Sequence, residues 1–180
     1  MFHFLSISNL NTSKGTFVLL DAAQFLLKET SDFHVHFVGA PTAEISAERM
    51  QQEIAIRGLQ DVVTYHGRQY GEDKESRFSE ANCFVHPTLD DCFPLVILEA
   101  MQHSLPVIAT PVGAIPDIIM DGVTGVLIPI EQPESLALKL YDVIQRPYQY
   151  RLMGVCAQER VEKDYSLASF EEQLVKIIND

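Results

Sequence analysis

Two acidic residues, Asp91 and Glu99, bracket the start of a strongly apolar stretch with helical character. Glu99 is the only charged residue from Pro94 to Met101, and a carboxylate there needs water, a cation or ligand hydroxyls, because burying it bare is costly. At about 1.5 Å per residue, Glu99 lies roughly 8 Å along the helix from its start. That start offers free N–H groups and a partial positive charge, which favour an anion such as phosphate. The stretch therefore indicates a site for a sugar phosphate or nucleotide-sugar; the alternative is a solvated turn acid with an exposed helix glutamate.

Other residues could belong to the same site. Lys14 begins a predicted helix, where a cation opposes the helix dipole, and an anion bound between Lys14 and the helix amides would reverse that cost. Gly67-Arg68 and Gly113 follow two later apolar strands and could contact a base, a sugar or a phosphate, and His86 could reach a ligand from the strand before the acidic loop. A surface lysine, a lone surface arginine and an ordinary glycine turn are the alternative interpretations.

The composition narrows the functional classes. A chain of 180 residues, 47% hydrophobic and 21% charged, has the length and composition of one soluble globular domain. The net charge of −12 argues against a nucleic-acid surface, although a nucleotide ligand needs only local positive potential. We expect a cytoplasmic protein with reduced thiols. The three cysteines are widely spaced, the start lacks a basic signal region, and no apolar run reaches ~20 residues. The histidines and acids form no metal-binding motif, so no metal is expected, and neither GxGxxG nor a P-loop pattern is present.

Apolar runs of strand length alternate with helical patterns, which predicts a parallel α/β sheet. We expect strands at residues 2–8, 33–38, 62–66, 83–86, 106–109 and 126–128. We expect helices that open at 14–15 and span 44–57, 72–81, 94–101, 116–120, 134–144, 148–164 and 167–178. This alternation fits a doubly wound, Rossmann-like six-stranded sheet of order 3-2-1-4-5-6 with carboxyl-terminal helices. Ligands bind such sheets at the switch point, where the loops 9–14 and 87–93 would bring Lys14 to the acidic stretch.

These residues resemble a known family, the retaining family 4 glycosyltransferases of GT-B fold. The family frame has two acids separated by seven residues, and this chain reads Asp91-Cys-Phe-Pro-Leu-Val-Ile-Leu-Glu99-Ala-Met101. Further matches are Ser8-Asn-Leu-x-x-x-Lys14-Gly15, Phe37-Val-Gly39, Leu105-Pro-Val-Ile-Ala-Thr110, Gly113-Ala-Ile-Pro-Asp117 and Asp121-Gly-Val-Thr-Gly125. The resemblance covers nearly the whole chain. It implies that residues 1–180 are a single nucleotide-sugar donor-binding domain, the carboxyl-terminal half of an enzyme whose amino-terminal acceptor domain is missing.

The resemblance also implies roles for individual residues. The catalytic pair would be Asp91, which binds the donor sugar, and Glu99, which binds the ribose hydroxyls. Lys14 and the amides of Pro94, Leu95 and Val96 would hold the diphosphate, and the loop at 67–68 would lie near the base. The full set of donor-binding residues would be Asn9, Lys14, Gly15, Gly67, Arg68, Phe93, Pro94, Leu95, Val96 and Gly113. Three of the site residues depart from the family pattern, because Asn9 stands in place of an arginine, Asp91 in place of a glutamate and Pro94 in place of a glycine.

The activity implied is retaining transfer of a hexose from a UDP-, GDP- or ADP-sugar to a glycan or lipid-linked acceptor, in polysaccharide biosynthesis and without a metal. The full-length enzyme would be cytoplasmic or peripheral at the cytoplasmic membrane face. The isolated domain would be inactive by itself, and exposed apolar residues of its last helices would favour self-association. Two alternatives remain open: a sugar-nucleotide epimerase-like GT-B domain, and a non-catalytic nucleotide-binding module of five-stranded, flavodoxin-like topology.

Overall fold

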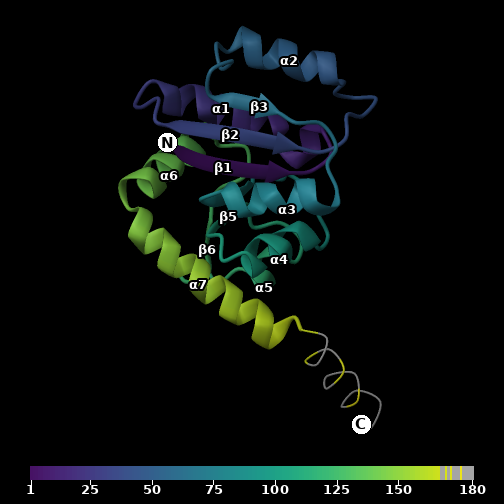
Figure 1. Ribbon diagram of the computed structural model, residues 1–180, viewed down its shortest axis with the longest axis vertical. Coiled ribbons are helices and arrows are strands. Elements are labelled where there is room, and N and C mark those ends of the chain that lie inside the picture. The colour runs from purple at the N-terminus through teal and green to yellow at the C-terminus, as the bar shows by residue number, and fades with distance from the viewer. Residues whose placement is uncertain (167–168, 170, 172–174, 176–180) are drawn as a thin grey trace.

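The computed structural model describes residues 1–166, 169, 171 and 175, so the helix expected at 167–178 lies almost wholly outside the described residues. Within the described part, six parallel strands form one sheet of order β3-β2-β1-β4-β5-β6 (Figure 1). The strands are β1 (Phe2–Ile7), β2 (Phe33–Val38), β3 (Val63–Tyr65), β4 (Cys83–His86), β5 (Val107–Ala109) and β6 (Gly125–Leu127). The predicted doubly wound order is confirmed.

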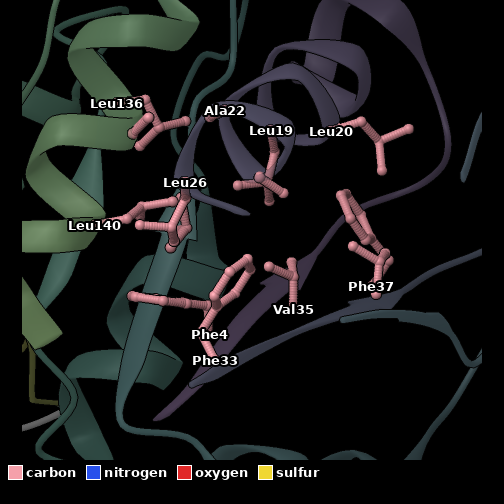
Figure 2. Close-up of a cluster of buried hydrophobic side chains, with 14 of the residues drawn as sticks. Phe4, Leu19, Leu20, Ala22, Leu26, Phe33, Val35, Phe37, Leu136 and Leu140 are labelled. Carbon is pink, nitrogen blue, oxygen red and sulfur yellow. The ribbon is translucent and has the colours of Figure 1, made fainter. Parts of the chain in front are cut away.

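Helices cover both faces of this sheet, because successive side chains along a strand point to opposite faces and both faces are apolar. On one face lie α1 (Thr16–Leu27), α2 (Ala47–Ile56) and α6 (Pro133–Gln145). Their core, part of which Figure 2 shows, includes Phe4, Leu19, Leu20, Leu26, Phe33, Val35, Phe37, Leu136 and Leu140. On the other face lie α3 (Gly71–Glu80), α4 (Leu95–Gln102), α5 (Ile115–Ile118) and α7 (Pro147–Asp164). Their core includes Leu5, Val38, Phe78, Phe84, Ile97, Met101, Ile115, Ala157 and Val161.

The helix expected to open at Lys14 is preceded by a separate tight turn. The 3-10 helix η1 (Thr12–Lys14) is capped by Asn11, whose side chain accepts the N–H of Ser13 at 3.0 Å. Gly15 then takes a left-handed conformation, φ 73°, before α1 begins. Lys14 therefore projects from a tight turn at the end of β1, just ahead of the first turn of α1.

Four of the six histidines form a row across β1, β2 and the end of β3. His3 Nδ1 lies 2.9 Å from His36 Nε2, and His36 Nδ1 lies 2.9 Å from His66 Nε2. His34 completes the row and contacts the Thr64 hydroxyl at 2.8 Å. Burial, together with the neighbouring histidines, lowers the pKa of His36 to about 3, so this ring is neutral near pH 7. No group of three or more His, Cys, Asp or Glu side chains in the described part of the chain is arranged to hold a metal ion.

The helix α7 follows α6 and leads toward the carboxyl terminus (Figure 1). It buries Ala157 and Val161, whereas Tyr148, Leu152 and Val155 are exposed. Self-association through these exposed side chains stays a prediction. Among the described residues, none of the helices combines the length and the apolar character that crossing a bilayer would require.

Candidate functional site

The loops that follow β1 and β4 are held together at the switch point of the sheet. The Ser13 carbonyl accepts the N–H of Leu89 at 2.7 Å and the hydroxyl of Thr88 at 3.1 Å. At Gly15, a Cβ would lie 2.0 Å from the carbonyl oxygen of Pro87, so only glycine allows the two backbones to approach this closely. Gly15, predicted as a donor-binding residue, therefore has a packing role that brings the turn carrying Lys14 against the acidic loop.

Lys14 and His86 converge on the carboxylate of Asp91. Lys14 Nζ donates to Asp91 Oδ2 at 2.8 Å and to the Asp90 carbonyl at 3.0 Å, and His86 Nε2 lies 3.2 Å from the same Oδ2. The hydrogen bond from His86, and then the hydrogen bond and charge of Lys14, lower the pKa of Asp91 to about 2 against the opposing effect of burial. Asp91 is thus a firmly ionised carboxylate at the carboxyl end of β4.

His86 is 2% exposed and supports Asp91 from beneath the surface. Its other ring nitrogen, Nδ1, is buried and has no hydrogen-bond partner among the described residues. A proton on Nδ1 would therefore be an unsatisfied buried donor, which favours the tautomer with the proton on Nε2, donated to Asp91. The sequence suggested that His86 could reach a ligand. In the structure, the His86 ring contacts the carboxylate of Asp91, which lies on the loop after β4.

The start of α4 presents free backbone donors beside this ion pair. Pro94, expected as the first helical residue, is instead the N-cap, with ψ 98°, and no side chain of the described residues caps the helix. Proline has no N–H, so Pro94 cannot donate to a diphosphate as the resemblance implied. The amides of Leu95 and Val96 are the available donors, since the first N–H groups of a helix have no intrahelical acceptor. Phe93, 43% exposed, flanks them.

Gly113 fixes the far side of the acidic loop. It has φ 53°, and a Cβ there would lie 1.9 Å from the Asp91 carbonyl oxygen. The following residue, Ala114, donates its N–H to the Cys92 carbonyl at 2.9 Å. Gly113, predicted to approach a sugar or phosphate, therefore packs its backbone directly on the loop that carries Asp91.

Glu99 has a partner that the sequence analysis did not identify. Lys74 Nζ, from α3, lies 2.7 Å from both carboxylate oxygens of Glu99. The Lys74 side chain is 22% exposed and the Glu99 side chain 40% exposed, so the pair remains in contact with solvent. The helix predicted at 72–81 gave no signal for this contact, because no local pattern connects Lys74 with a glutamate on the next helix.

A hollow of about 150 Å³ that includes Lys74 in its lining lies at the carboxyl ends of β1 and β2. It is lined by Ile7, Ser8, Asn9, Val38, Gly39, Ala40, Arg68, Gln69, Tyr70 and Lys74. The Arg68 guanidinium lies 5.8 Å from the centre of the Tyr70 ring. Gly67 has φ 73°, and its carbonyl accepts the N–H of Gly39 at 2.8 Å, which links the loops after β2 and β3.

The predicted residues thus form two adjoining groups. Lys14, Gly15, Asp91 and Gly113 meet around the start of α4. Asn9 and Arg68 line the hollow, Gly67 precedes Arg68, and Glu99 pairs with Lys74 of its lining. The loop after β1 and the helix α4 belong to both groups, so one elongated ligand could span them. A larger hollow of about 770 Å³ lies between β6, α6 and α7. It contains none of the predicted residues, and Asp142, one of the two acids in its lining, already pairs with two basic side chains.

Comparison with known proteins assigns the chain to a class of enzymes. The model of a family described as glycosyl transferases group 1 matches residues 2–146, so the chain belongs to that family. Among curated proteins, it is 31% identical over 162 residues to the D-inositol 3-phosphate glycosyltransferase of Paenarthrobacter aurescens (strain TC1), an alignment that covers 89% of this chain and 40% of the relative.

Two solved structures share the fold. The structure of Anabaena Alr3699/HepE in complex with UDP matches with a TM-score of 0.89 at 21% identity, over 99% of this chain and 48% of that one. The carboxyl-terminal domain of a glycosyl transferase group 1 family protein (LpcC) from Francisella tularensis matches with a TM-score of 0.81 at 24% identity, over 92% of this chain and 87% of that one. The chain therefore spans less than half the length of HepE and of its curated relative.

Proposed function

We propose that this chain is the donor-binding, carboxyl-terminal domain of a retaining family 4 glycosyltransferase that transfers a hexose from a nucleotide-sugar to a glycan or lipid-linked acceptor. The observation that carries the proposal is the arrangement around α4, where Asp91, Lys14 and free helix amides surround one end and Glu99 lies further along. The family, and the UDP bound to the HepE structure, support it. The six strands described here do not fit the five-stranded flavodoxin-like alternative, and the family favours a transferase over an epimerase.

Each residue of the arrangement has a distinct task in this proposal. Glu99 accepts the ribose hydroxyls, and Asp91 accepts a hydroxyl of the donor sugar, since an ionised carboxylate is an acceptor with several lone pairs. Among the described residues, Lys14 donates two of its three N–H groups to Asp90 and Asp91. Its third N–H group, together with the amides of Leu95 and Val96, binds the diphosphate.

This placement explains how the domain would contribute to catalysis. Negative charge builds on the leaving diphosphate as the glycosidic bond breaks, and fixed donors aimed at that charge stabilise the transition state. Lys14 and the start of α4 are such donors, and for this reason we expect no metal cofactor. Asn9 in place of an arginine removes one further cation, so we expect weak donor binding.

The acceptor groups would come from the part of the enzyme that its longer relatives possess beyond this domain. We therefore expect the isolated chain to bind donor without turning it over. The full-length enzyme would act in polysaccharide biosynthesis, in the cytoplasm or at the cytoplasmic face of a membrane that carries a lipid-linked acceptor.

Calorimetric titration of the 180-residue chain with UDP, GDP and ADP tests the proposal. We expect one nucleotide to bind, and Glu99→Ala to weaken it by at least about tenfold, the effect of losing a charge-assisted hydrogen bond. Glu162→Ala, at an exposed position of α7, is the matched control and should bind as the wild type does. Absence of binding by a folded wild-type chain with all three nucleotides would contradict the proposal.

A further inference from the structure

The helix α3 is anchored so that it presents Lys74 to α4. Its Phe78 is 1% exposed and stacks on the His103 ring, with centroids 4.9 Å apart and planes at 8°. His103 Nε2 lies 2.9 Å from Glu75 Oε2, which ties the same two helices together a second time. Lys74 therefore extends from a helix whose position relative to Glu99 is set by packing.

The geometry of the Lys74–Glu99 pair leaves room for a ligand. Each carboxylate oxygen lies 2.7 Å from Lys74 Nζ. A carboxylate has about four lone-pair sites, so one site on each oxygen remains available among the described residues. Because Lys74 faces both oxygens, the free lone pairs lie on the outer sides of the carboxylate, where they can accept hydroxyls such as those of a ribose. The lysine also carries positive charge to the rim of the hollow beside Asn9.

We propose that Lys74 is a positioning residue for nucleotide binding: it holds the Glu99 carboxylate in an orientation whose outer lone pairs accept from the ribose hydroxyls. This inference rests on the proposed function of the chain. Lys74 acts through Glu99, so its effect depends on the hydroxyls of the ligand. The pair is partly solvated, and such pairs contribute little to folding stability, so Lys74 has a larger effect on binding than on unfolding.

A pair of nucleotides that differ only in the ribose hydroxyls separates this role from a direct contact with phosphate. The probes are UDP and 2′,3′-dideoxy-UDP, or the matching guanosine or adenosine pair if one of those nucleotides binds. We expect Lys74→Met to weaken UDP binding about tenfold, the effect of one misoriented charge-assisted hydrogen bond, and to leave dideoxy-UDP binding unchanged. Lys74→Arg, which keeps a donor fork suited to a carboxylate, should retain most of the affinity, and Lys163→Met on α7 should match the wild type.

A double-mutant cycle gives the second test. In a Glu99→Ala background, Lys74→Met should have no further effect on UDP affinity, because the group that Lys74 orients is gone. Equal loss of both nucleotides in Lys74→Met, or unchanged UDP affinity in a folded Lys74→Met variant, would overturn the positioning role while leaving the proposed function intact. Failure of the wild-type chain to bind any nucleotide would instead overturn the proposed function, and the role of Lys74 with it.

Discussion

Replacing Asp91 by asparagine keeps the shape of the side chain and removes the charge that Lys14 and His86 share. In the folded chain the pKa of Asp91 falls from 3.8 to about 2, which at about 1.36 kcal/mol per pH unit sets an upper limit of about 2.4 kcal/mol. The side chain is 16% exposed, so water screens part of this interaction. We expect Asp91→Asn to lower the free energy of unfolding by about 1–2 kcal/mol near pH 7.

Urea denaturation followed by circular dichroism measures this difference. The control is Asp90→Asn, because the Asp90 side chain is exposed and makes no ion pair among the described residues. Asp91 has a lowered pKa in the folded state, so its contribution is present above pH 3.8 and is lost as the pH falls toward about 2. The gap between Asp91→Asn and the wild type should therefore narrow in that window. Equal stability of the Asp91→Asn and Asp90→Asn variants near pH 7 would refute the reasoning.

Three further predictions address other parts of the fold. Gly15→Ala should destabilise the chain more than Gly58→Ala, and thermal unfolding of the two variants measures the difference. Both glycines have positive φ, which costs an alanine roughly 1–2 kcal/mol. Of the two, only Gly15 lies where an added Cβ would collide with backbone atoms of the described residues. Because the pKa of His36 is lowered, the contribution of this residue to the free energy of unfolding is present above pH 6.5 and is lost as the pH falls toward about 3. In acid denaturation, the stability of His36→Gln should therefore fall less steeply with pH than that of the wild type. Tyr150→Phe should cost about 1 kcal/mol in urea unfolding, because it removes the hydrogen bond of a buried hydroxyl to Asp142; an unchanged midpoint would contradict the contact.

The strand order could be predicted because its signals are local. The strand at 83–86 is buried at every position in the structure, and its first three residues form one apolar run. Parallel strands covered on both faces lose the polar alternation of a half-exposed strand, so such runs alternating with helical patterns identify a doubly wound sheet. The switch point follows from the order, and with it the approach of Lys14 to Asp91, which the structure shows as an ion pair.

Details of the candidate site were less predictable. Pro94 was expected inside the helix, because proline is common at the first helical position, but its ψ of 98° makes it the cap. Local preference allows either position, and the path of the preceding loop decides between them. That loop is fixed by Gly113 packing on the Asp91 carbonyl, a contact between segments that follow different strands.

Local patterns along the chain were therefore enough to predict the fold class, the strand order and the segments that meet at the carboxyl edge of the sheet, because hydrophobic periodicity and turn residues act over short distances. Which side chains meet there depends instead on how the helices pack. Lys74 reaches Glu99 because α3 and α4 pack on the same face with a particular rotation, and His86 reaches Asp91 from beneath the surface. Such rotations are set by the fit of buried side chains such as Phe78, and no local pattern records them.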